Sequence, residues 1–313
     1  MKVSRTRSTV RAVALVLCVG VGRSVAAQGV ERSSEVAWRP QLPLQGSLVV
    51  FGLHVSSEET VVAVQGTLAG EPLHFERVGA WFNAVAGVPL DARDSVMARI
   101  VVERVAGGRD TVTAALPVGV RTARREQLAA DPDLVQPPES LAPRIRAERA
   151  LVRRIKRRAH DTPRLWREPF ARPRPGPVSS GFGGARVFNG VARSRHLGVD
   201  FAARVGEPVR AANRGVVTFV GALYFSGHTL FLDHGGGLVT GYLHLSRALV
   251  ARGDTVSAGQ VIARVGATGR VTGPNLHWLA SYGNVLVDPM DLLTLDPAAP
   301  VATAADRAPG SPR

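Results

Sequence analysis

Short stretches of alternating apolar and polar residues, closed by glycine, serine or aspartate, recur through most of this chain. Examples are SLVVFGLHV and SVMARIVVERV in the first half and HTLFLDHG and LVTGYLHLS in the second. An alternation with a period of two places one face of a strand against a core and the other toward water. With 33 glycines, 21 prolines and few long helical patterns, the chain is expected to be mainly β, with many tight turns.

Changes in composition divide the rest of the chain into segments. The short strands of 38–120 predict a small antiparallel β-sandwich of immunoglobulin type. Residues 121–177 are rich in proline and arginine and predict a connector that contains a basic helix. Glycine-punctuated strands return in 178–293 and predict a second β domain. The proline- and alanine-rich tail, 294–313, is expected to be disordered.

The first residues, 1–27, have the pattern of an export signal. Basic residues in MKVSRTRSTVR precede the apolar run AVALVLCVGVG, and small residues follow it near Ala26 and Ala27. The run is short for a membrane span, so an uncleaved anchor is the weaker alternative and no transmembrane span is expected after cleavage. Cys18, the only cysteine, lies in this run, so no disulfide is expected in the mature chain. The protein is therefore expected to be exported, either periplasmic or secreted.

The chain is strongly basic, with a formal net charge of +14, of which five charges lie in 1–27. For an exported protein, this excess favours cell-wall polymer or a membrane surface as the partner, and no segment resembles a nucleic-acid-binding module. Eight lysines and arginines lie between Arg144 and Arg158, where apolar residues recur at helical spacing. Two interpretations remain open: a basic face that binds anions, or a solvated helix that packs one apolar stripe on a neighbour.

Five of the eight histidines lie between His196 and His277. The motif RHLGVDF places His196 four residues before Asp200, and in a regular strand their Cα atoms would be about 13 Å apart. Two side chains that far apart cannot bind one zinc ion, so a shared site requires the chain to bend, and Gly198 would allow this. His54 and His74, in the first β segment, are interpreted as ordinary strand residues.

Two further histidines alternate with leucines. In GYLHLS, alternation predicts Tyr242 and His244 on one face of a strand, with the leucines on the other. In NLHW, Asn275 and His277 are expected to face one way and Leu276 the other. Each histidine by itself could be a structural residue, but all of them in this order indicate a site with chemistry.

In this order, the segments from SSGFGGARVFNG through HLGVDF and GYLHLS to TGPNLHW resemble the LytM/lysostaphin family of zinc endopeptidases. The resemblance implies a compact, mostly antiparallel lysostaphin-type β domain with a groove across one sheet. It also implies hydrolysis of peptide bonds in the stems or cross-bridges of peptidoglycan. The upstream sandwich and connector are similar to those of exported members in Gram-negative bacteria.

The resemblance also implies roles for single residues. His196, Asp200 and His277 would bind Zn²⁺ and leave a fourth position for water, and His244 would handle protons. Asn275 stands where the family has a second catalytic histidine. An amide can donate a hydrogen bond but cannot carry a proton near neutral pH, so activity is expected to be reduced.

Two more residues, Asn189 and Arg186, are expected to line the groove or to approach the zinc; in some zymogens of the family an upstream asparagine caps the metal. Three functions follow: a peptidoglycan endopeptidase, a catalytically impaired regulator of cell-wall amidases, or a wall-binding scaffold. The retained metal ligands favour the first of these, whereas Asn275 favours the second.

Overall fold

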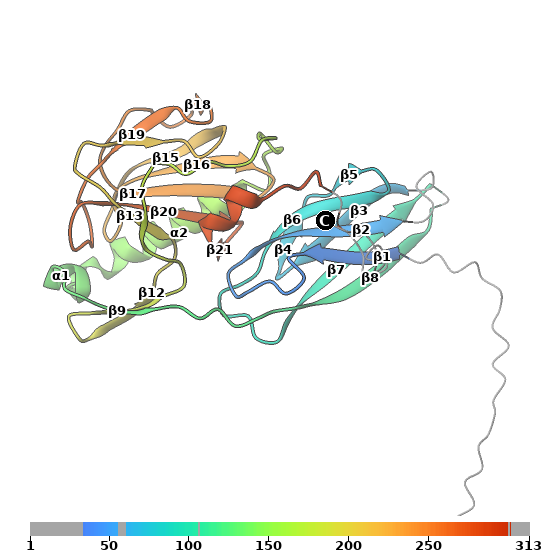
Figure 1. The fold of residues 1–313 in the computed structure, drawn as a ribbon, viewed down its shortest axis with the longest axis horizontal. Helices are drawn as coiled ribbons and strands as arrows, with labels where there is room; N and C mark the ends of the chain where they lie inside the picture. Colours follow the sequence, from blue (N-terminus) through green and yellow to red (C-terminus); the bar gives the residue numbers. More distant parts are fainter. Residues whose placement is uncertain (1–33, 56–60, 106, 300, 302–313) are drawn as a thin grey trace, which may run out of the picture. The chain divides into compact units, whose positions relative to one another are not determined.

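The computed structural model describes residues 34–55, 61–105, 107–299 and 301. The predicted export signal, 1–27, and the tail from 302 onward lie outside the described residues. Strands dominate the described part of the chain (Figure 1), so the expectation of a mainly β protein is confirmed. Among the described residues, no helix is both long enough and apolar enough to span a membrane.

The first half of the chain forms two four-stranded antiparallel sheets, in the orders β1-β2-β6-β5 and β4-β3-β7-β8. The strands of the first are Ser34–Arg39, Leu48–Val55, Trp81–Gly87 and Glu76–Val78, and those of the second Glu71–Leu73, Val61–Leu68, Ser95–Arg104 and Arg109–Pro117. Alternate residues of β7 are buried, as the period-two pattern predicts. Apolar side chains from both sheets, such as Phe51 and Ile100, share one core, so the two sheets form a sandwich.

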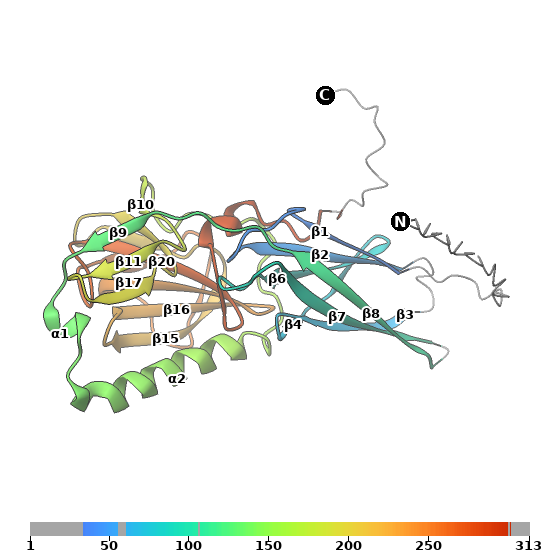
Figure 2. The same ribbon diagram turned by 90° about the horizontal axis from the view of Figure 1, so that it is seen from below.

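The connector contributes more structure than its composition predicts. Its elements are β9 (Arg125–Leu128), α1 (Pro132–Val135), the 3-10 helix η2 (Glu139–Leu141) and α2 (Ala142–Arg158). Helix α2 runs beside β15 and β16 (Figure 2), and its Ile155 shares an apolar cluster with Leu243 and Leu279. Strand β9, which the sequence did not predict, pairs in parallel with β11 (Ala185–Phe188).

The second half forms a ten-stranded sheet, with the main order β10-β13-β20-β17-β16-β15-β18. These strands are Val178–Ser180, Val199–Ala202, Asn275–Tyr282, Leu238–Ala248, Gly227–Gly235, Gly215–Leu223 and Thr255–Val256. Strands β14 (Pro208–Arg210), β19 (Val261–Val265) and β21 (Val285–Val287) extend it, and β12 (Ala192–Arg195) pairs with β11. One face packs the largest core cluster, which includes Phe201, Tyr242 and Trp278. The other face carries the α2 cluster and is the face that the histidines can use.

One expectation from the sequence is wrong, and another does not hold for the residues that the structure describes. His74 lies between β4 and β5 rather than in a strand, and its Nε2 is 2.8 Å from Nδ1 of His160, whose Nε2 is 2.9 Å from the Glu71 carboxylate. Disorder was expected for 294–313, but in the described residues 294–299 and 301 the chain makes defined contacts: Asn83 donates to the carbonyl of Pro297 at 2.9 Å, and Val301 is buried. In both cases the interaction partner is distant in sequence, so no local sequence pattern predicts the contact.

Candidate metal centre

Two adjacent strands and the end of a third bring the three predicted metal ligands together. Asp200 of β13 and His277 of β20 are directly paired across an antiparallel ladder, and His196 follows the last residue of β12. Oδ1 of Asp200 is 2.8 Å from Nδ1 of His277 and 3.1 Å from Nε2 of His196. The two ring nitrogens are themselves 3.0 Å apart. All three side chains are buried, so a compact three-donor cluster exists at this position.

The donor set and its spacing fit a metal ion. Around a tetrahedral zinc ion with bonds near 2.0–2.1 Å, neighbouring ligand atoms lie about 3.3 Å apart. The observed separations of 2.8 to 3.1 Å are a few tenths of an ångström shorter, which a small outward movement of the side chains would correct. Two imidazoles and one carboxylate are also the ligands of a catalytic zinc site that keeps a position open.

A set of hydrogen bonds outside the cluster orients the ligands. Nδ1 of His196 donates to the carbonyl of Gly181 at 2.7 Å, which leaves Nε2 free to face the other ligands. Oδ2 of Asp200 accepts a hydrogen bond from Nη2 of Arg186 at 2.5 Å. Nε of Arg186 donates in turn to the carboxylate of Glu126 at 2.9 Å. Such outer hydrogen bonds hold metal ligands in place and tune their affinity.

The electrostatics keep the cluster ready to bind a cation. Burial alone would raise the pKa of Asp200, but hydrogen bonds and charge from His196 and His277 outweigh it, so the net shift is strongly downward. Burial lowers the pKa of His277, although Asp200 partly opposes that shift. The cluster therefore presents an ionised carboxylate and a neutral imidazole near pH 7, and these are the forms that bind metal.

The chain bends between His196 and Asp200, as expected, but Gly198 has a different reason to be glycine. Its φ is not in the left-handed region, so the bend itself does not demand glycine. A Cβ at Gly198 would lie 2.6 Å from Nε2 of His277 and 2.5 Å from the carbonyl oxygen of Trp278. The close approach of β20 to this loop is what excludes a side chain.

His244 joins the site through a break in its strand. Tyr242 lies in the core on the opposite face, so the expectation that Tyr242 and His244 share a face is wrong. The backbone of His244 has a φ of 61°, which interrupts the alternation of β17, and its N–H donates to the carbonyl of Ser226 at 3.0 Å. This left-handed residue turns the imidazole toward His277, with ring centroids 5.9 Å apart.

The proton on His244 is placed by one hydrogen bond. Nδ1 donates to the carbonyl of Thr268 at 2.8 Å, so in the neutral ring Nε2 is the unprotonated atom. Burial, followed by the neighbouring His277, lowers the pKa of His244 to about 4. His244 is therefore neutral near pH 7 and has one acceptor nitrogen.

Two hollows border the site and share four residues, Arg186, Phe188, His244 and Arg270. We call the first the helix-side hollow; it also includes Lys156 and Leu279 and contacts His196 and His277. The second, the strand-side hollow, also includes Glu126, Ser180 and Asn275 and contacts Asp200. The strands β13, β17 and β20 thus form the floor between two recesses that meet at His244.

Asn275 lies in the strand-side hollow, and Leu276 points into the opposite core, as alternation predicts. Its Nδ2 donates to the carbonyl of Gly273 at 3.1 Å, while its buried Oδ1 has no hydrogen-bond partner among the described residues. The amide thus has a second N–H and an acceptor that are available to a bound molecule.

Asn189 does not lie at the site. It occupies the turn between β11 and β12 with a φ of 50°, and its amide exchanges two hydrogen bonds with the backbone of Ala130, at 2.9 and 3.0 Å. It lines neither hollow, so the expectation that it lines the groove or approaches the metal is corrected. Arg186 does line both hollows, but two carboxylates occupy its guanidinium, so its first role is to orient Asp200.

The remaining histidines of this region, His228 and His234, line neither hollow. His234 is fully buried, with Nδ1 2.7 Å from the carbonyl of Arg214 and Nε2 2.7 Å from the Thr240 hydroxyl. His228 is exposed at the start of β16. Glu126 and Ser180 also contact the site. Neither was predicted, because nothing around them in the sequence differs from an ordinary polar segment.

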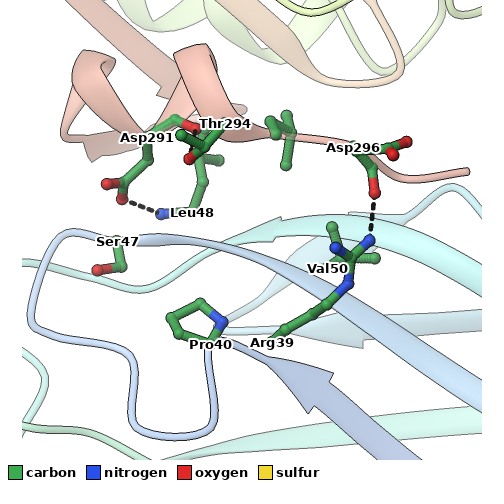
Figure 3. Close-up of a pocket in the computed structure, with 9 residues that line it drawn as sticks. Arg39, Pro40, Ser47, Leu48, Val50, Asp291, Thr294 and Asp296 are labelled. Atoms are coloured by element: carbon green, nitrogen blue, oxygen red, sulfur yellow. Dashed lines mark hydrogen bonds between the residues drawn. The ribbon is translucent and has the colours of Figure 1, made fainter. Parts of the chain in front are cut away.

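A third hollow lies away from the histidines, between β1, β2 and the 3-10 helix η3 (Pro289–Thr294) (Figure 3). The Asp291 carboxylate accepts a hydrogen bond from the N–H of Leu48 at 2.9 Å. Arg39 donates to the backbone carbonyls of Asp296 and Ala299. These hydrogen bonds join the C-terminal segment to the sandwich, and the hollow lies along that junction.

Comparison with known proteins identifies the family. Residues 194–289 match the model of Peptidase family M23, a span that contains all three predicted ligands. A solved protein of the M23 peptidase family from Pseudomonas aeruginosa is 31% identical, with a TM-score of 0.61, over 80% of this chain and 94% of that one. The chain belongs to peptidase family M23. The resemblance to LytM/lysostaphin-type peptidases is thereby confirmed.

Curated M23 relatives match the C-terminal region. The peptidoglycan DD-endopeptidase ShyC of Vibrio cholerae is 42% identical over 102 residues, which is 32% of this chain and 24% of that protein. The DD-carboxypeptidase/endopeptidase Mpg of Neisseria meningitidis is 42% identical over 113 residues, 36% of this chain and 25% of that protein. The matches therefore span about a quarter of the length of these M23 relatives.

Proposed function

We propose that this M23 family member is an exported, zinc-dependent endopeptidase that hydrolyses peptide bonds in peptidoglycan. The observation that carries the proposal is the convergence of His196, Asp200 and His277 beside His244, at the point where two hollows meet. The relatives that are named peptidoglycan DD-endopeptidases support the substrate class. The basic charge of the chain is consistent with an anionic wall polymer.

His196, Asp200 and His277 would hold the metal, and the remaining residues supply the other functions. Bound zinc would polarise the scissile carbonyl and acidify a water molecule. Nε2 of His244, which is unprotonated near pH 7, would accept a proton at the reacting centre and return it to the leaving amine. Arg186 and Glu126 would keep Asp200 in its binding orientation.

Asn275 would limit the rate of this enzyme. Its free N–H can stabilise negative charge on a carbonyl oxygen, which retains part of the effect of a histidine at this position. It cannot accept a proton, so His244 is left as the proton carrier of the site. We infer an active but slowed hydrolase rather than an inert relative.

The test is hydrolysis of purified peptidoglycan by the mature chain, from residue 28 onward. Wild type with one equivalent of zinc should release soluble peptides, a chelator should stop the release, and added zinc should restore it. Asp200→Asn is the matched inactive control, because it keeps the side-chain shape and removes the anionic ligand. A protein that clears no peptidoglycan at any zinc concentration, but activates a cell-wall amidase in a mixed assay, would contradict the proposal and support a regulator.

A further inference from the structure

One lysine of helix α2 differs from every other basic residue on that helix. Lys156 is only 7% exposed, whereas the arginines of α2 are all exposed. It lines the helix-side hollow together with His196, His244 and His277. Helix α2 therefore places one cationic side chain in the helix-side hollow, beside the proposed metal ligands, while its arginines are exposed to solvent.

The ammonium of Lys156 is unpaired within the part of the chain that the structure describes. Among the described residues, it makes no hydrogen bond or ion pair, and apolar side chains of Leu243, Leu279 and Leu286 line the same hollow. Burial lowers its pKa to about 8, so it is still mostly protonated at pH 7. A buried, unpaired charge is costly to the folded state, so the position calls for a reason other than stability.

The charge of the helix-side hollow is one-sided. Three arginines line it besides Lys156, and none of its lining residues, all of them described, is acidic. Arg186 is neutralised by Asp200 and Glu126, and Arg195 is exposed to solvent. Arg270 is held between the rings of Phe188 and Phe225, at 4.4 and 4.8 Å from their centroids. Two ring faces fix the guanidinium of Arg270 without cancelling its charge.

We propose that Lys156 and Arg270 form an anion subsite that binds a carboxylate of the peptide substrate beside the metal centre. The inference rests on the proposed function for its substrate class, because stem peptides carry free carboxylates at their C-terminus and on side chains. A carboxylate entering the hollow would meet two cations and an apolar wall, where charge-assisted hydrogen bonds are strong. The subsite would select anionic peptides over neutral ones and fix their register.

A purely structural role for Lys156 makes a different prediction. The methylene stem of a lysine can cover apolar surface while its head group reaches solvent. If packing were the whole role, Lys156→Met, which keeps the length of the stem and removes the charge, would bind every peptide as wild type does. The comparison between charged and neutral peptides therefore separates the two roles.

The experiment measures binding of an uncross-linked stem tetrapeptide to the zinc-loaded mature chain by calorimetry. Three forms of the probe are compared: with all carboxylates free, with the C-terminus amidated, and with the side-chain carboxylates amidated. Lys156→Met should weaken binding of the free form by about 10-fold to 100-fold. It should leave unchanged the form that lacks the recognised carboxylate, which identifies that carboxylate as terminal or side-chain.

Matched variants complete the design. Arg153→Met, on the exposed face of the same helix, should bind all three forms as wild type does, and Lys156→Arg should retain part of the preference for the free form. Lys156→Met should unfold at the same temperature as wild type or higher, because it removes an unpaired buried charge. If Lys156→Met unfolds early, Lys156→Gln is used for the same comparison.

Equal weakening of all three forms, or no weakening of any, would overturn the subsite. Because the probe contains no cross-link, its binding is measured whether or not the protein hydrolyses peptidoglycan. Failure of the proposed hydrolysis and failure of this subsite are therefore separate results.

Discussion

Gly198 lies between the proposed ligands His196 and Asp200 and has no side chain. The carbonyl of Trp278 and the ring of His277 occupy the space in which its Cβ would lie. The position of the His277 ring therefore depends on the absence of a side chain at residue 198, which is two residues from both His196 and Asp200. His244 shows the reverse case, since an imidazole is kept in a left-handed backbone conformation that disfavours side chains.

We predict that Gly198→Ala weakens both the fold and the metal site. The new methyl would have to displace β20 or the His277 ring, and overpacking of this kind costs about 1–3 kcal/mol. Thermal unfolding and zinc competition with a chromogenic chelator should both show the loss. Gly108→Ala is the control, because a Cβ there meets open space and its φ is not positive. Wild-type zinc affinity in Gly198→Ala would contradict the close-approach argument.

Asn275 allows a test of the missing proton carrier. Asn275→His should raise kcat/KM on peptidoglycan by roughly 10²-fold, because a positioned base contributes about that factor. The strand-side hollow leaves room for the ring. Asn275→Gln keeps an amide and should show no gain, and zinc content should be equal in all three proteins. A working enzyme whose rate is the same with histidine would mean that this position does not transfer protons.

At the scale of elements, strand β9 contributes a residue to the site that the sequence did not predict. This short strand comes from the connector and pairs in parallel with β11, which brings Glu126 against Arg186 and Ser180. Burial would raise the pKa of Glu126, but the hydrogen bonds from Ser180 and Arg186 outweigh it and leave the carboxylate ionised. The connector therefore contributes a carboxylate to the hydrogen bonds around the proposed ligand Asp200.

Glu126→Gln should weaken zinc binding by about 10-fold to 100-fold, the usual effect of removing an outer hydrogen-bond partner. The variant loses a negative charge near the site and weakens the hydrogen bond that orients Arg186. Both changes are expected to lower the affinity for zinc. Competition titration gives the affinity, and Glu139→Gln, an exposed change on η2, serves as the matched control. Equal affinities in the two variants would show that β9 does not support the site.

At the scale of the molecule, the C-terminal segment forms polar contacts with residues of the first half of the chain. Arg121 forms an ion pair with Asp288 at 2.8 Å, and Asp291 of η3 accepts from the backbone of Leu48. Burial, with the nearby Asp288 also contributing, raises the pKa of Asp291 from 3.8 to about 6. The protonated form of Asp291 is therefore the one that the folded state prefers.

The sign of the pH effect follows from that preference. Because the folded pKa lies above the unfolded one, the contribution to stability is complete below about pH 4 and is lost as pH rises through 6. Asp291→Asn does not titrate and keeps the acceptor for Leu48. In urea unfolding from pH 4 to 7, wild type should lose more stability than Asp291→Asn. Parallel stability curves for the two proteins would contradict this expectation.

Much of the fold and the metal cluster could be predicted from local patterns. Period-two alternation determined the strands of both β regions, and helical spacing determined the buried stripe of α2, because burial of apolar side chains enforces these periods. The motifs around His196, His244 and His277 indicated the site, and the resemblance assigned the ligands that the structure brings together. The departure at Asn275 was also visible in the sequence alone.

Only the tertiary structure decided which distant groups meet. The orientation of His244 depends on a left-handed residue inside a strand, and alternation assumes a regular backbone, so that orientation was predicted for the wrong reason. Glu126, Lys156 and the partners of His74 and Asp291 come from segments far apart in the chain. Local sequence reports the periodicity of each element, whereas the pairing of elements is set by the sum of packing and hydrogen bonds across the whole molecule.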